Sequence, residues 1–284
     1  MFSYQINTLY LQDEIPLGNG DITMVAGVRY DWYTSSDTPR ENPNFIARNG
    51  YSNQQNFDGL SLLQPRLGLT WDVSDSLNLR GGFGLYSGGN PNVWLSNNYS
   101  NDGITQVEVQ DRSLDDDGIG GNTLFTIPFT GEGRPIYDIP QHLYDAVASG
   151  TANSGVNALA PNFKLPREWK FAVGGTWDFD AGFMGTDYRL MADYLYSRKE
   201  KSAIIRDATL EQIGTAPDGR PLYKSIDRSD PDCAVPTSPD CSNRNFAQDF
   251  ILGNVIGDSG DSQTLSLSLS KSYDWGLDWT LAYA

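Results

Sequence analysis

Few side chains in this 284-residue chain are suited to specific chemistry, and they are widely scattered. The two cysteines, Cys233 and Cys241, lie close together in the segment PDCAVPTSPDC. A close pair in a loop rich in Pro, Asp and Ser predicts a small disulfide-closed loop, and with it an oxidising compartment or the cell surface. The only histidine, His142, is distant in the sequence, which argues against a metal site at the cysteines.

The acidic segment SLDDDGIGG at residues 113–121 is a second candidate site. Asp115 and Asp117 alternate ahead of a glycine, as carboxylates do in part of a calcium loop. The spaced oxygen ligands and final glutamate of an EF-hand are missing, so a solvated turn is favoured over a weak Ca²⁺ site. We therefore expect no cofactor. With one histidine and no reactive cysteine, we also expect no enzyme.

The charge balance bears on possible partners. The chain holds 20 Lys and Arg against 36 Asp and Glu, a formal net charge of -16. Phosphate binding needs Lys and Arg, so nucleic acid is not an expected partner. Most of the acidic residues fall in segments that are predicted to be loops. Simple solvation of those loops is favoured over an outer surface that attracts cations.

Five basic residues instead occupy strand-like positions, opposite the apolar residues of the same segments. They have two interpretations. Structural pairing with acids such as Asp31, Asp187 and Asp193, or with acidic groups of a plug, is favoured. The alternative is that they line the path of an anionic ligand through a barrel lumen. These lumen-facing candidates are Arg29, Arg66, Arg80, Lys170 and Arg189.

The segments that carry these residues repeat with a period of two. Apolar and polar side chains alternate in ITMVAGVRYDW at residues 22–32, which predicts a β-strand between two unlike environments. Strands of about ten residues, joined alternately by tight turns and long loops, are typical of an outer-membrane β-barrel. The sequence predicts eight strands, at residues 2–15, 22–34, 62–72, 77–86, 167–179, 187–197, 263–273 and 277–284.

A soluble β-sandwich also fits simple alternation. Two observations favour the barrel: short and long connections alternate strictly, and the apolar faces end in aromatic residues, as interfacial girdles do. Within the long connections, NVWLSNNY and ITQVEVQ predict extensions of the strands, and residues 138–150 predict a short helix. The girdle residues are Trp32, Tyr33, Trp71, Trp177, Phe179, Tyr196 and Trp279.

The direction of the strands has a topological consequence. Short turns of bacterial barrels face the periplasm and long loops face outside. Both ends of this chain are therefore expected at the extracellular rim, whereas a complete barrel is expected to begin and end in the periplasm. No signal peptide precedes the first strand pattern. The sequence thus predicts a piece of a larger barrel with long extracellular loops.

Two longer segments resemble a known family. PRLGLTWDVSDSLNLRGGFGLYSGG at residues 65–89 resembles the barrel of TonB-dependent outer-membrane receptors. LPREWKFAVGGTWDF, followed by DYRLMADYLYSRKEKSAIIRDATL, is similar to the Oar-like branch of those receptors. The resemblance covers most of residues 21–284. It implies a 22-stranded barrel with an N-terminal plug, of which residues 1–284 are a partial barrel without plug or TonB box.

This resemblance implies uptake of a scarce nutrient, such as a siderophore, an oligosaccharide or a peptide. The implied partners are outer-membrane lipid, the TonB–ExbB–ExbD system and the plug of the parent protein, together with an unidentified small extracellular ligand. The implied location is the outer membrane of a Gram-negative bacterium. A passive porin-like or adhesin-type barrel without energy coupling is the alternative, and a soluble β-rich binding module is the third and least favoured hypothesis.

Overall fold

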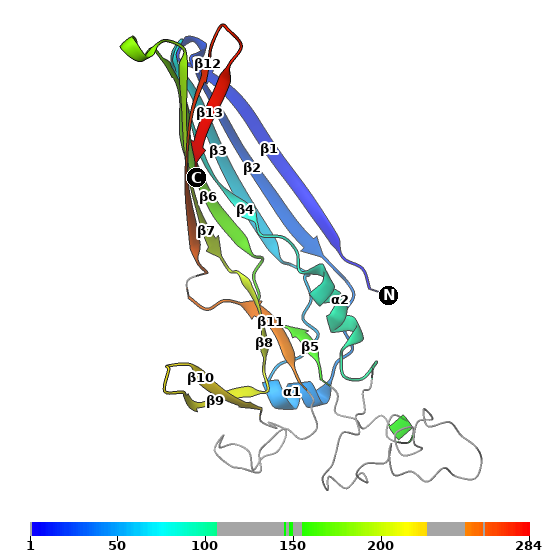
Figure 1. Ribbon diagram of the computed structural model, residues 1–284. Helices are drawn as coiled ribbons and strands as arrows, with labels where there is room; N and C mark the ends of the chain where they lie inside the picture. The colour runs from blue at the N-terminus through cyan, green and yellow to red at the C-terminus, as the bar shows by residue number, and fades with distance from the viewer. Residues whose placement is uncertain (1, 107–144, 146–147, 150–154, 226–247, 258) are drawn as a thin grey trace, which may run out of the picture.

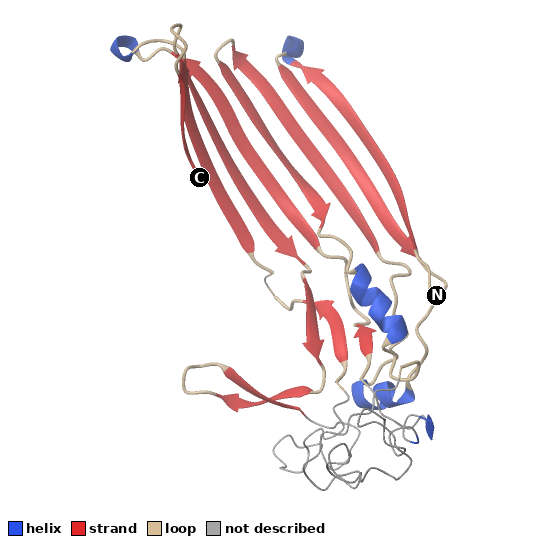
Figure 2. Cartoon of the chain, turned by 45° about the vertical axis from the view of Figure 1, so that its right-hand side comes forward, coloured by secondary structure: helices blue, strands red, loops and turns tan. Residues whose placement is uncertain are grey.

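The computed structural model describes residues 2–106, 145, 148–149, 155–225, 248–257 and 259–284. Its main feature is one antiparallel sheet of eight long strands, which runs diagonally in Figures 1 and 2 and does not close on itself. The prediction of an all-β, antiparallel fold is confirmed. In sheet order, the strands are β1 (Gln5–Leu17), β2 (Ile22–Thr34), β3 (Ser61–Ser74), β4 (Leu77–Ser87), β6 (Arg167–Phe179), β7 (Tyr188–Glu200), β12 (Asp261–Ser272) and β13 (Asp278–Tyr283).

The register keeps the two faces of the sheet separate from strand to strand. On one face, Leu67 pairs with Phe83, and Phe83 with Phe171. On the other face, Arg66 pairs with Gly84, and Gly84 with Lys170. Because side chains alternate along each strand, one face of the sheet is mainly apolar and the other is mainly polar.

The apolar face is not covered by a second layer of protein. Leu63, Val173 and Leu265 keep 56%, 47% and 51% of their surface exposed. In a β-sandwich, such side chains would pack against a facing sheet. An apolar face left open along the full length of the strands is what a lipid-facing barrel wall requires.

All the short turns lie at one end of the sheet and all the long connections at the other (Figures 1 and 2). The turns are short 3₁₀ segments, η1 (Gly18–Gly20) and η2 (Gly182–Met184), and tight turns after β3 and β12. Lys271 of β12 fastens the η2 turn, because its ammonium donates to the Thr186 carbonyl and lies 4.7 Å from the ring centroid of Tyr188. It is 6% exposed although it stands on the apolar face.

The long connections fold together into a second region, which we call the loop layer: the described parts of residues 35–60, 88–166 and 201–260. It holds two helices, a three-stranded sheet and a hairpin. None of the helices in the described part of the chain is long and apolar enough to cross a membrane. Its elements are α1 (Pro43–Asn49), α2 (Asn92–Ser100), β5 (Asn157–Leu159), β8 (Ala203–Asp207), β11 (Phe250–Asn254), β9 (Leu210–Thr215) and β10 (Pro221–Ser225).

Local sequence explains why α1 forms in a polar connection. The Asn42 side chain accepts from the backbone N–H groups of Asn44 and Phe45, and Pro43 occupies the first turn. Gly50 ends the helix in the left-handed conformation, with a φ of 77°. These are the start and stop signals of a short helix.

The hydrophobic core of the described chain lies in and beside the loop layer rather than along the main sheet. Each of the three long connections contributes to it, and the ends of the neighbouring long strands close it from one side. Phe2 and Tyr4 also pack against it, which explains why β1 begins at Gln5 rather than at residue 2. The buried members are Tyr33, Phe57, Leu62, Leu85, Leu95, Leu159, Phe163, Leu165 and Leu252.

Two expectations from the sequence were wrong here. NVWLSNNY forms helix α2 instead of a strand extension, because the apolar Trp94 and Leu95 pack onto the loop-layer core and a helix brings them there together. Tyr33 is not a girdle residue. It lies on the polar side of β2, 4% exposed in the core, and its hydroxyl donates to Asn90.

Candidate functional site

The polar face of the main sheet carries the five basic residues that the sequence singles out. A hollow of about 710 Å³ lies along this face. Arg66, Arg80 and Lys170 line it, together with polar-face glycines that leave space between the larger side chains. A cationic wall around an open hollow is a candidate ligand path. The polar-face glycines of the lining are Gly27, Gly68, Gly82 and Gly174.

An ion pair spans three strands in the middle of this face. Arg80 of β4 and Asp193 of β7 both pair in register with Gly174 of β6. The Arg80 Nη2 atom lies 2.7 and 2.8 Å from the two carboxylate oxygens of Asp193. A Cβ atom at Gly174 would lie 2.1 Å from the Asp193 Oδ1 atom. The pair therefore depends on a glycine at the intervening position.

A second polar group lies nearer the loop layer. The Arg29 Nε atom donates to Asp31 at 2.9 and 3.1 Å. Thr8 Oγ1 and Gln64 Nε2 donate to the same carboxylate, at 2.7 and 2.6 Å. Asp31 and Gln64 are buried, whereas 44% of the Arg29 side chain is exposed. Hydrogen bonds satisfy the buried carboxylate. Arg29 is anchored through Nε and, by a longer bond of 3.4 Å, from Nη2 to Thr8 Oγ1, while 44% of its side chain stays exposed.

The third group is a tyrosine ring between two cations. The Arg66 guanidinium carbon lies 4.5 Å from the ring centroid of Tyr86, and the Lys170 ammonium lies 5.7 Å from the same centroid. Gly84 stands in register between the two cations. A Cβ atom there would lie 3.1 Å from both Arg66 Cγ and Tyr86 Cε2. Gly84 thus leaves the space in which the Tyr86 ring lies.

The remaining cations of the face have acidic neighbours. Arg189 donates to Asp178, its register partner on β6, at 2.7 and 2.8 Å. Lys170 lies 3.4 Å from Glu168. Asp187, considered from the sequence as a partner for these cations, instead accepts from the Thr186 hydroxyl at 2.7 Å. Among the described residues, Arg66 makes no ion pair with a carboxylate.

A smaller hollow of about 280 Å³ lies on the loop-layer side of the first. Arg29, Asp31 and Asn90 line it. Arg66 and Tyr86 line both hollows, so the two meet at the tyrosine–cation group. The charged groups of the smaller hollow are two arginines and one aspartate. It is therefore locally cationic in a chain of net charge -16.

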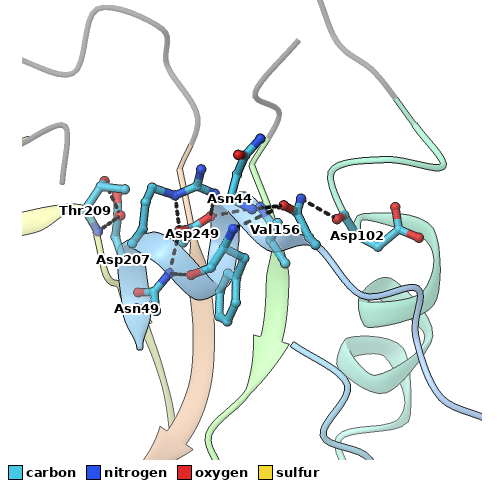
Figure 3. Close-up of polar contacts among 10 residues, drawn as sticks. Asn44, Asn49, Asp102, Val156, Asp207, Thr209 and Asp249 are labelled. Atoms are coloured by element: carbon cyan, nitrogen blue, oxygen red, sulfur yellow. Dashed lines mark hydrogen bonds and ion pairs between the residues drawn. The ribbon is translucent and has the colours of Figure 1, made fainter. Parts of the chain in front are cut away.

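A buried ion pair ties the loop layer together (Figure 3). Arg48 of α1 donates from Nε and Nη2 to the two carboxylate oxygens of Asp249, each at 2.8 Å. Asn49 Nδ2 and the Val156 backbone N–H also donate to Asp249, at 2.8 and 3.2 Å. Only 4% and 1% of the Arg48 and Asp249 side chains are exposed. One carboxylate thus joins all three long connections.

Two tyrosines of the loop layer, Tyr51 and Tyr99, have raised pKa values. Burial raises the pKa of Tyr51 to about 12, and the nearby negative charge of Asp249 acts in the same direction. Its ring packs edge-on against Phe45, with centroids 5.4 Å apart. Burial also raises the pKa of Tyr99, whose hydroxyl donates to the Asp37 carbonyl at 2.6 Å. Both hydroxyls are neutral donors at physiological pH.

Several predicted features lie outside the described residues. They include the cysteine pair Cys233 and Cys241, the acidic candidates Asp115 and Asp117, and most of the helix expected at residues 138–150. Within the described part of the chain, no three His, Cys, Asp or Glu side chains are grouped so that they could hold a metal ion.

Sequence reasoning found the cations but missed their surroundings. Tyr86 could have been found, because its place after LRGGFGL puts it on the same face as Arg80 and next to Gly84. The Arg48–Asp249 pair had no comparable signal, because its members lie 201 residues apart in different connections. The sequence signal for Lys271 was weak: it is a cation on the leucine side of a Leu/Ser alternation.

Comparison with known proteins agrees with this architecture. The model of a family described as "Outer membrane beta barrel domain" matches residues 2–283. None of the curated proteins searched matches the chain. Among solved structures, the siderophore receptor PirA from Pseudomonas aeruginosa is similar with 11% identity and a TM-score of 0.43, over 98% of this chain and 31% of that one. PirA from Acinetobacter baumannii is similar with 13% identity and a TM-score of 0.45, over 96% and 26%.

A third similar structure is the outer membrane transporter YddB from Escherichia coli, with 15% identity and a TM-score of 0.43. The match covers 94% of this chain and 21% of that one. The chain therefore spans less than a third of the length of each of these three proteins.

Proposed function

Because the chain belongs to the family of outer membrane β-barrel domains, with a match over residues 2–283, we propose that it is part of a receptor barrel that takes up a scarce nutrient. The family and the open apolar face both agree with the outer membrane of a Gram-negative bacterium. The family is one of barrels and not of enzymes. In this setting the polar face is the lumen wall, and outer-membrane lipid contacts the apolar face.

The observation that carries the proposal is a set of polar hollows beneath a folded loop layer. The described parts of the long connections pack together at the rim. They share a core, an additional sheet and a buried ion pair. A passive porin needs an open, water-filled mouth. A receptor instead needs a structured surface outside the lumen that collects a ligand and passes it to the wall below, as this arrangement would allow.

We extend the proposal to energy coupling through the TonB–ExbB–ExbD system and a plug in the parent protein. The support is the resemblance of residues 65–89 and 165–210 to TonB-dependent receptors of the Oar-like branch. The nutrient belongs to the siderophore, oligosaccharide or peptide class that this resemblance implies. An oligosaccharide or peptide would suit the many Asn, Asp, Ser and Tyr side chains of the long connections as well as a metal chelate would.

Two measurements on the intact protein in its natural length test this proposal. The detergent-solubilised protein should be retained on an immobilised periplasmic domain of TonB, and an unrelated porin should not. In a planar lipid bilayer it should give no steady open-channel current, because a plug fills the lumen. Failure of retention together with stable ohmic channels would establish the alternative, a passive porin-like barrel.

An adhesin-type barrel is the other form of the alternative. It would also lack retention on TonB, but it would show no channel current. The two measurements together therefore distinguish a TonB-coupled receptor, a passive porin-like barrel and an adhesin-type barrel.

A further inference from the structure

We propose that Arg66, Tyr86 and Lys170 form an anion-binding site in the lumen wall, with Arg29 at its loop-layer side. The inference rests on the proposed function, and it specifies part of the ligand: a group bearing a carboxylate or a phosphate. These residues stand on four different strands, β3, β4, β6 and β2, yet they border two hollows that meet at Arg66 and Tyr86.

Arg66 presents hydrogen-bond donors that the described protein leaves largely unused. Arg66 is exposed, and it makes no ion pair with any described carboxylate. Its one hydrogen bond to a side chain within the described part is a long one, 3.5 Å from Nη2 to Gln64 Oε1. The guanidinium lies over the Tyr86 ring, with its carbon 4.5 Å from the ring centroid, and this contact uses few of its five N–H donors. A planar fork held in place with free donors suits a bidentate oxyanion.

The neighbours of Arg66 are held in place by buried hydrogen bonds and close packing. Gln64 is 2% exposed and is fixed from both sides: it donates to Asp31 at 2.6 Å and accepts from the Ser87 backbone N–H at 3.1 Å. Gly84 leaves the space for the Tyr86 ring. The site therefore has a rigid second layer, and a ligand would meet donors whose positions are already set.

The charged side chains at the site leave a net positive charge. Arg29, Arg66 and Lys170 face two carboxylates, those of Asp31 and Glu168. One positive charge is left over in a chain that carries -16 in total. An anion approaching the negatively charged protein would find its favourable position here, where hollows and cationic donors coincide.

The test uses the intact protein in detergent micelles, titrated with citrate as the carboxylate probe and with inorganic pyrophosphate as the phosphate probe. We expect at least one probe to bind, and Arg66→Gln to weaken its binding about tenfold or more, as for the loss of a charge-assisted bidentate contact. Lys170→Gln should weaken binding less, since that lysine already lies beside Glu168. Which probe binds identifies the kind of anion.

The matched control is Arg189→Gln. It removes the same charge from the same face, but Arg189 is paired with Asp178 and does not line either hollow. Binding should stay within about twofold of the unmutated protein. Equal losses in Arg66→Gln and Arg189→Gln would show that only overall charge matters and would overturn the site. Absence of binding of both probes to the unmutated protein would overturn it as well.

A folding control keeps the result interpretable. Arg66→Lys is the variant to use if Arg66→Gln fails to fold. It retains the positive charge over Tyr86 but loses the planar guanidinium, so it should bind the probe with intermediate affinity. If Arg66→Lys binds the probe as tightly as the unmutated protein does, the proposed bidentate contact of Arg66 is contradicted. Retention on TonB is measured in parallel. Loss of anion binding with normal retention contradicts the site alone, and loss of retention contradicts the proposed function.

Discussion

The long sheet and the loop layer solve the problem of stability in opposite ways. In the sheet, Val173 and Leu265 remain 47% and 51% exposed, and the strands are held by continuous backbone ladders. In the loop layer, Phe57 and Val156 are fully buried and the strands are short. The sheet depends on lipid to cover its apolar face. The loop layer carries a core of its own, like a small water-soluble domain.

This difference separates the effects that mutations should have in the two regions. In the loop layer, packing and buried polar contacts should dominate, as in any soluble protein. In the sheet, the cost of a substitution should depend on the face to which it points and on its depth in the bilayer.

The largest effect is expected from Asp249→Ala. It leaves the Arg48 guanidinium buried without its carboxylate, which costs about 3–5 kcal/mol. Because the pair joins the three long connections, hydrogen exchange should rise throughout the loop layer and stay unchanged in the ladders of the main sheet. Asp218→Ala is the control, since its pair with Arg220 is exposed and should not change exchange elsewhere. A uniform rise in both regions would show that they are not separate.

The next effect tests the two faces of one strand. Leu267→Arg places a charge on the lipid side of β12 and should cost about 2–4 kcal/mol in unfolding from lipid vesicles. Ser268→Arg puts the same charge on the lumen side of the neighbouring residue and should be tolerated. Equal costs for the two substitutions would contradict the assignment of the faces.

Gly174→Ala should have a smaller, local effect. The new methyl group meets Asp193 Oδ1 and the Ala192 carbonyl oxygen, at 2.1 and 2.8 Å, so the Arg80–Asp193 pair must shift. We expect a loss of about 1–3 kcal/mol, typical of overpacking. Gly68→Ala is the matched control on the same face, because its nearest neighbour, Val25 Cβ, is 3.9 Å away. Similar unfolding free energies for the two variants would contradict this prediction.

The smallest effect concerns pH. The pKa of Tyr51 is raised to about 12, above an ordinary value of 10.0, so the folded loop layer favours the neutral phenol. This contribution is complete below pH 10 and is lost as the pH rises from about 10 to about 12. Tyr51→Phe cannot ionise, so the variant should lose less loop-layer protection than the unmutated protein over this range. If loop-layer protection depends on pH in the same way in Tyr51→Phe and in the unmutated protein, ionisation of Tyr51 does not destabilise the loop layer.

The strands of the main sheet could be predicted because their pattern is local. The expected ranges 22–34 and 167–179 coincide with β2 and β6, and the other strands differ at their ends by a few residues. The faces were also predictable, since an alternating strand fixes both sides at once. Local pattern was not sufficient for Tyr33. This aromatic residue at a strand end belongs to the loop-layer core and not to a girdle.

The loop layer could not be predicted in the same way, because its contacts join residues far apart in the chain. Nothing near Arg48 indicates Asp249, and the short strand β5 pairs only with β11, which lies in a different long connection. The candidate site falls between these cases. Alternation placed Arg66 and Lys170 on one face, but only the register shows that Gly84 and Tyr86 stand between them.

The buried pair in the loop layer also has a consequence for the order of folding. Arg48 and Asp249 are separated by 201 positions, so closing the chain between them directly would carry a large entropic cost. Zipping of the eight long strands shortens that path, because it brings the starts and ends of all three connections to one rim. The sheet should therefore assemble first and the loop layer last. In a refolding time course, the backbone amides of Val156 and Phe250 should then become protected from hydrogen exchange later than those of the main sheet.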